Sequence, residues 1–182
     1  MGTQKVLLPF GERTILQAII EACVLAGLRD IIVVTGHQPD PVETAVRPLP
    51  CRTAHNANYQ QGMLSSIRCG VDALPPGAAG FLLFLGDQPE LSPGVVQAVH
   101  GALEADPDAI VLPVFNGRRG HPVGIGARFR EAILSRYDDV GLRGLMQEYA
   151  DAVRTVAVED AGVLMDLDTP EEYEAALRRY RL

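Results

Sequence analysis

The stretch LLFLGDQPELSPG, residues 82–94, carries the signal that decides the fold. Its apolar run is typical of a buried strand, and the run ends in a glycine followed by Asp87. Similar short apolar or β-branched runs occur at residues 30–36, 51–56, 80–87, 108–114 and 152–158. Stretches with helical spacing separate them, at residues 14–26, 61–74, 92–105, 127–134, 141–149 and 170–181. This alternation predicts an α/β fold with a mostly parallel sheet flanked by helices.

Composition limits the class of protein. A chain of 182 residues with 47% hydrophobic residues is long enough for a sizeable core and short enough for one domain, residues 1–182. Its net charge of −7 argues against a general affinity for nucleic acid or an anionic membrane. The apolar runs are far shorter than the roughly 20 residues needed to cross a bilayer. We therefore expect a cytoplasmic protein with no nucleic-acid or membrane partner.

Polar residues follow the predicted strands. In an open parallel sheet, ligands bind beyond the carboxyl ends of the strands, where Thr35, Asn56 and Asp87 occur in this sequence. The segment at residues 115–126 holds four glycines, two arginines and a histidine, and it is predicted to be a functional loop. Asp87 has a simpler explanation as a turn residue, which the preceding glycine and the nearby proline favour.

A second group of carboxylates weighs against that simpler explanation. Asp166 and Asp168 directly precede a helix whose start is already capped by Thr169 with Glu172, so the cap does not account for the aspartates. We expect that at least one of the two aspartates can face the site. Two carboxylates from separate strand ends suit Mg²⁺ when phosphate oxygens complete its shell. Phosphoryl or nucleotidyl transfer is the candidate chemistry.

The segment at residues 55–74 leads from polar residues through Gly62 into a predicted helix with Ser65 in its first turn. Asn56 both donates and accepts hydrogen bonds, as recognition of a base or ribose requires. The start of the helix also suits an anion. For any single one of these residues, an ordinary loop with asparagine turns is the better explanation.

Taken together, six motifs resemble the MobA-like nucleotidyltransferases over nearly the whole chain. They are VLLPFGERTILQAII, VVTGH, HNANYQQGMLSSIRCG, LGDQPELS, GRRGHPVGIG and MDLDTPEEYE, in this order. The GRRGHP stretch, residues 117–122, is similar to the molybdenum cofactor cytidylyltransferase branch. The resemblance implies a three-layer α/β/α Rossmann-like fold that transfers CMP from CTP to the phosphate of molybdopterin or molybdenum cofactor, with Mg²⁺ and release of pyrophosphate. A molybdoenzyme or its chaperone would be a further partner.

The resemblance also implies residue roles. Asp87 would be the first Mg²⁺ ligand and Asp168 the second, with Asp166 in reserve, and Lys5 would neutralise the triphosphate as a catalytic residue. The residues expected near the nucleotide are Gly2, Lys5, Thr35, Asn56, Gly62 and Ser65. The residues expected near the pterin phosphate are Arg118, Arg119 and His121, for which solvent-facing or structural roles stay open.

One departure concerns the amino terminus. Family members begin with a strand and a turn resembling LAAGxSxRMGxxK, of which Met1, Gly2 and Lys5 are present here. The first strand of the sheet and the backbone amides that wrap the triphosphate are therefore expected to be missing. Two alternatives stay open: a non-catalytic nucleotide- or pterin-binding protein, and a GTP-using or other small-molecule nucleotidyltransferase.

Overall fold

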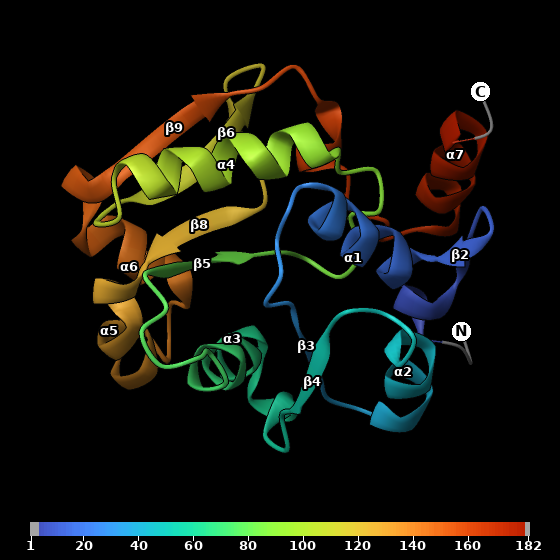
Figure 1. Ribbon diagram of the computed structural model, residues 1–182, viewed down its shortest axis with the longest axis horizontal. Coiled ribbons are helices and arrows are strands. Elements are labelled where there is room, and N and C mark those ends of the chain that lie inside the picture. The colour runs from blue at the N-terminus through green and yellow to red at the C-terminus, as the bar shows by residue number, and fades with distance from the viewer. Residues whose placement is uncertain (1–3, 181–182) are drawn as a thin grey trace.

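The computed structural model describes residues 4–180 and shows three separate groups of strands with helices around them (Figure 1). β3 (Ile32–Thr35) and β4 (Arg52–His55) form a parallel pair. A larger sheet runs in the order β5 (Gly80–Leu83), β8 (Val123–Gly126), β6 (Ile110–Phe115) and β7 (Arg118–Arg119), and β9 (Val153–Ala157) pairs with β6. A short hairpin of β1 (Pro9–Phe10) and β2 (Arg13–Thr14) lies near the amino terminus.

Strands of one direction predominate, as expected. β6 and β9 are parallel, and β5 runs the same way because both β5 and β6 are antiparallel to β8. The two strands that run against this direction are β8 and the two-residue β7. All five runs that were predicted to be strands contain one, so the α/β prediction is confirmed.

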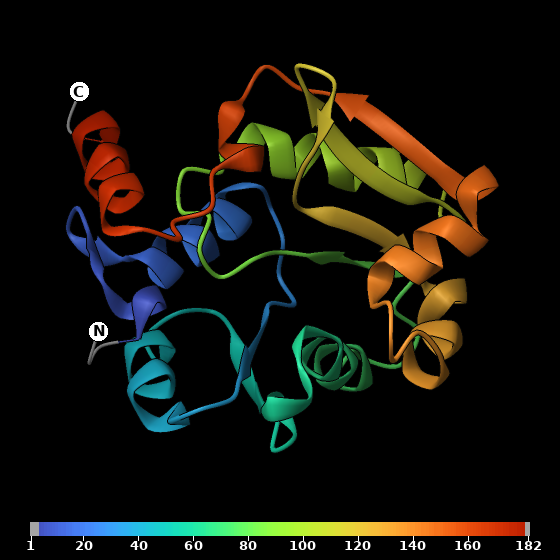
Figure 2. The same cartoon turned by 180° about the vertical axis from the view of Figure 1, so that it is seen from behind.

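The helices form layers on both faces of the larger sheet. α4 (Pro93–Ala105) packs on one face in a core with β6 and β9 side chains (Figure 1). On the other face, which Figure 2 shows from behind, lie three helices: α3 (Met63–Asp72), α5 (Arg130–Ser135) and α6 (Leu142–Glu148). The expected three-layer α/β/α arrangement is therefore present.

The remaining helices surround the amino-terminal half. α1 (Ile15–Leu25) begins at Thr14, whose side chain and that of Gln17 form a reciprocal capping box. Gly27 follows α1 with φ of +91°, a conformation that suits a glycine at the end of a helix. α2 (Pro39–Val46) has no counterpart among the predicted elements, and α7 (Pro170–Tyr180) closes the described chain. Short 3₁₀ turns occur at Lys5–Leu7, Tyr59–Gln61, Ala127–Phe129, Ala150–Ala152 and Ala161–Leu164.

The prediction of an irregular loop at residues 115–126 is wrong. This segment contains β7 and β8, and β8 lies inside the sheet with Val123 and Ile125 only 4% and 1% exposed. Its glycines are needed for close packing, because a Cβ at Gly126 would collide with the carbonyl oxygen of Pro107. A composition typical of loops here serves a central strand.

The β3–β4 pair and the larger sheet do not pair with each other within residues 4–180. A cavity of about 920 Å³ separates β3 from β5. Over the same described residues, no helix is long and apolar enough to cross a membrane.

Candidate active site

The site begins where β5 ends. Asp87 follows β5 after a short irregular stretch, and its side chain is 23% exposed. The Nζ atom of Lys5 donates to Asp87 Oδ2 at 2.7 Å and to Asp168 Oδ1 at 3.0 Å. Two aspartates that are far apart in sequence therefore contact the same ammonium group, that of Lys5.

Charge explains the protonation of Lys5. Partial burial alone would lower the pKa of its ammonium group, but the hydrogen bonds and negative charges of Asp87 and Asp168 together raise that pKa above its usual value. The ammonium therefore remains charged at neutral pH. Two carboxylates stabilise one cation at this point.

The start of α7 positions Asp168. Thr169 and Glu172 form the predicted capping box, in which Glu172 N donates to Thr169 Oγ1 and Glu172 Oε2 accepts from the Thr169 amide. The same Glu172 oxygen also accepts the backbone N–H of Asp168 at 2.9 Å. The helix cap thus holds the backbone of Asp168 while its side chain, 70% exposed, reaches Lys5.

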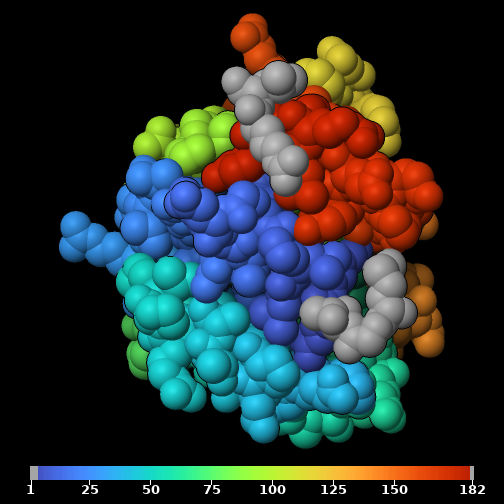
Figure 3. Space-filling model, turned by 90° about the vertical axis from the view of Figure 1, so that its right-hand side faces the viewer, coloured from blue at the N-terminus to red at the C-terminus, as the bar shows by residue number. Residues whose placement is uncertain are grey.

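Packing near both ends of the chain supports this arrangement. Figure 3 shows the amino-terminal segment in contact with the carboxyl-terminal helix region. Phe10 and Ile15 share a buried cluster with Ala176 of α7, and the Tyr173 hydroxyl donates to the Pro9 carbonyl. This buried apolar cluster therefore holds together the two chain segments that carry Lys5 and Asp168.

Asp166, the reserve ligand, has a different partner. Its Oδ1 accepts a hydrogen bond from Nε2 of Gln88 at 2.7 Å, and Gln88 is only 3% exposed. Asp166 and Asp168 therefore have different partners, Gln88 and Lys5, although in a regular extended segment side chains two residues apart would lie on the same face. Sequence reasoning did not assign a role to Gln88, although its position directly after Asp87 was a usable signal.

Asn56 is buried, at 4% exposure, and its side chain organises the loop before α3. Its Nδ2 donates to the hydroxyls of Ser65 and Ser66 at 2.8 and 3.0 Å, and its Oδ1 accepts from the Asn58 amide. Ser65 in turn donates to the carbonyls of Asn58 and Gly62. These contacts give the Asn56 amide a structural role in shaping this edge of the site.

Two other predicted nucleotide residues lie at the same edge. Thr35 is 3% exposed, its carbonyl accepts the Asn56 amide at 2.7 Å, and its hydroxyl lies 3.4 Å from His55 Nδ1. Gly62 caps α3 with φ of +96°, a conformation that suits glycine. Gly2 lies outside the described residues.

The predicted pterin-side residues separate into two kinds. Arg118 and Arg119 form the exposed strand β7, and no hydrogen bond or ion pair joins them to the two carboxylates within residues 4–180. His121 is half-buried, and its backbone N–H donates to the Val163 carbonyl at 3.0 Å. Burial lowers the pKa of His121, although the charges of Asp166 and Asp87 act in the opposite direction. His121 therefore lies within electrostatic reach of Asp87.

The residues present suit a metal ion whose coordination shell is completed by the substrate. Among the described residues no group of three or more histidine, cysteine or acidic side chains could hold a metal ion. Asp87 and Asp168 already contact one cation, the ammonium group of Lys5. Mg²⁺ is bound by one or two carboxylates together with phosphates and water, so this pair fits such an ion better than a metal enclosed by protein.

Comparisons with known proteins agree with this geometry. The molybdenum cofactor cytidylyltransferase of Escherichia coli (strain K12) is 28% identical over 183 residues, covering 99% of this chain and 90% of the relative. The nicotine blue oxidoreductase of Paenarthrobacter nicotinovorans is also 28% identical, over 92% of this chain and 85% of the relative.

Solved structures extend the comparison. Rv0371c from Mycobacterium tuberculosis H37Rv has a TM-score of 0.82 at 25% identity, covering 98% of this chain and 91% of that chain. Its manganese complex has a TM-score of 0.80 at 25% identity, covering 97% and 93%. The family model described as the MobA-like NTP transferase domain matches residues 1–153. The chain therefore belongs to the MobA-like NTP transferase domain family.

Proposed function

We propose that this protein is an Mg²⁺-dependent cytidylyltransferase that transfers CMP from CTP to the phosphate of molybdopterin or molybdenum cofactor. The observation that carries the proposal is that the carboxylates of Asp87 and Asp168 meet beyond β5, where both contact the ammonium group of Lys5. The preference for CTP and a molybdenum cofactor acceptor is supported by the E. coli relative and by the GRRGHP stretch at residues 117–122.

The reaction needs no nucleophile from the protein. An oxygen of the acceptor phosphate attacks the α-phosphorus of CTP, the bond from that phosphorus to the oxygen bridging the β-phosphate breaks, and pyrophosphate leaves with the bonding electrons. Asp87 and Asp168 would hold the divalent ion, which when bound draws charge from the triphosphate oxygens. Lys5 contributes a further positive charge at the same point.

The other predicted residues would define the two substrate subsites. The edge formed by Thr35, Asn56 and Gly62 would receive the nucleotide, with Asn56 acting by holding the Ser65 hydroxyl and the loop. Arg118, Arg119 and His121 would contact the pterin phosphate. For the arginines the support is their exposure on β7 and the family resemblance.

The test measures pyrophosphate release with CTP or GTP, Mg²⁺ and molybdopterin. We expect CTP to be preferred, and we expect Asp87→Asn to lower turnover by about 10²-fold or more, because it removes charge where the metal would bind. The matched control is Asp138→Asn, which breaks the 2.6 Å ion pair between Asp138 and Arg68, away from the site. The control should retain activity.

Each contrary outcome identifies an alternative. Preference for GTP would assign the chain to guanylyl transfer, and turnover with another acceptor alone would assign it to different small-molecule chemistry. Binding of CTP without turnover would indicate a non-catalytic binding protein. Full activity of Asp87→Asn would refute the metal assignment.

A further inference from the structure

The two carboxylates of the candidate site come from two chain segments that are joined beside the site. One is the loop after β5 that carries Asp87, and the other carries Asp168 and continues into α7. The backbone N–H of Leu167 donates to the Asp87 carbonyl at 3.1 Å. Gln88 Nε2 donates to Asp166 Oδ1 at 2.7 Å. These contacts hold the loop against the approach to α7.

A further contact joins the same two segments at the far end of α7. Arg179 lies in the last turn of α7, and Glu90 lies three residues after Asp87. The Nε atom of Arg179 donates to Glu90 Oε1 at 2.8 Å, and its Nη2 donates to Glu90 Oε2. The Glu90 side chain is only 15% exposed. A two-point ion pair with a largely buried carboxylate is better ordered and stronger than the usual surface pair.

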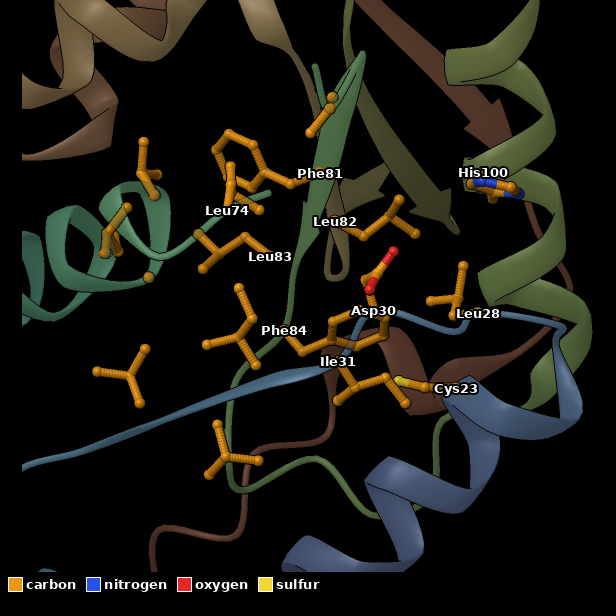
Figure 4. Close-up of a pocket in the computed structure, with 18 of the residues that line it drawn as sticks. Cys23, Leu28, Asp30, Ile31, Leu74, Phe81, Leu82, Leu83, Phe84 and His100 are labelled. Atoms are coloured by element: carbon orange, nitrogen blue, oxygen red, sulfur yellow. The ribbon is translucent and has the colours of Figure 1, made fainter. Parts of the chain in front are cut away.

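The apolar contacts of α7 are modest. Among its residues as the structure describes them, only Ala176 is buried, and Tyr173 and Leu177 are partly buried against the same cluster. Phe84, on the chain that continues from β5, packs against this cluster as well. Figure 4 shows Phe84 on the side of the cavity where Cys23 of α1 lies. Because α7 buries little apolar surface, its polar contacts contribute much of what fixes its position.

We propose that Arg179 and Glu90 are positioning residues for the metal site. Their ion pair fixes α7 on the loop after β5 and so sets the distance between the carboxylates of Asp87 and Asp168. Asp168 depends on this support, because its side chain is 70% exposed and its backbone is held by Glu172 of the same helix. A movement of α7 therefore moves Asp168 with it. The inference rests on the proposed function in one respect, that Asp168 is a metal ligand.

Charge and position predict opposite effects when Arg179 is replaced. Loss of a positive charge would by itself favour a bound cation slightly. Loss of the ion pair would instead release the end of α7 and weaken metal binding, because Asp168 would no longer be held near Asp87. Weaker binding in Arg179→Met therefore reports a change of position rather than of charge.

The experiment measures Mn²⁺ binding by calorimetry together with the melting temperature Tm. We expect Arg179→Met and Glu90→Gln each to weaken Mn²⁺ binding by about threefold or more, and the double variant to bind no more weakly than the weaker single variant. The matched control is Arg178→Met. It removes the same charge from the adjacent residue and breaks the exposed 3.7 Å ion pair between Arg178 and Glu174 within α7. The control should bind Mn²⁺ as the parent protein does.

Two results would overturn the proposal alone. One is unchanged or tighter Mn²⁺ binding in Arg179→Met while Asp168→Asn binds more weakly, and a fall in the Tm of Arg179→Met would then show a purely structural ion pair. The other is equal weakening in Arg178→Met, because the effect would not depend on contact with Glu90. Unchanged binding in Asp168→Asn would refute the metal assignment of the proposed function and this inference with it.

Discussion

Replacing Gly120 by alanine is the sharpest test of how the segment before β8 is held. A Cβ atom at Gly120 would lie 2.8 Å from the carbonyl carbon of Val163 and still closer to its oxygen. Real Cβ contacts essentially never fall below 3.0 Å, so the backbone must move. That movement is opposed on two sides, because Gly120 N donates to the Pro113 carbonyl at 2.9 Å and His121 N donates to Val163 at 3.0 Å.

The magnitude follows from these constraints. Val163 is completely buried, so its backbone has little room to retreat. Overpacking of this kind costs about 1–3 kcal/mol of unfolding free energy. In a domain of this size each kcal/mol lowers Tm by about 2–4 °C, so Gly120→Ala should melt about 2–12 °C below the parent protein.

Gly101→Ala is the matched control. Gly101 lies within α4, and a Cβ there would meet no atom within 4 Å. Alanine in a helix interior is favoured over glycine by about 0.5–1 kcal/mol, so the control should melt slightly above the parent protein. Thermal unfolding followed by circular dichroism compares the three proteins. A Gly120→Ala variant that melts at or above the parent temperature would refute the close packing of Gly120 on Val163.

Three further predictions concern charged and polar residues. Burial lowers the pKa of His121 below its usual 6.5, so the unfolded state binds the proton more readily than the folded state. The free energy of unfolding should therefore fall as the pH drops below about 6.5. Between pH 8 and pH 5, the Tm of His121→Gln should fall less steeply than that of the parent protein. Gln88→Glu replaces the buried donor to Asp166 by a like charge and should cost about 1–3 kcal/mol in urea unfolding at pH 7, whereas an unchanged midpoint would contradict the role of this hydrogen bond. Asp168→Asn should weaken Mn²⁺ binding by about tenfold or more in calorimetry, whereas Asp138→Asn, equally exposed at 71% against 70%, should leave it unchanged.

The sequence was sufficient where local chemistry and fold agree. The helix at residues 14–26 was predicted from the spacing of its apolar residues and is found as α1, which begins at a cap formed by Thr14 and Gln17. Asp87 was singled out by the rule that ligands bind beyond strand ends, whereas Asp168 was preferred over Asp166 only through the family resemblance; both contact Lys5.

Sequence reasoning failed where tertiary packing reverses a local preference. Gly124 and Gly126 read as loop residues, yet they allow β8 to lie close against Val111 and Pro107. α2 was missed because Pro39 and Pro41 suggest a turn, although proline is well tolerated in the first turn of a helix. Counting glycines and prolines shows neither which residues pack against a glycine nor where in a helix a proline lies.

The separation of the strand groups affects the proposed active site. Asp87 is attached to the sheet that contains β5, whereas Thr35 and Asn56 end the separate pair β3 and β4. A nucleotide that contacts both edges would bridge two groups of strands with no shared hydrogen-bond ladder within residues 4–180. The packing that sets the separation of these two groups therefore contributes to the preorganisation that charge stabilisation requires.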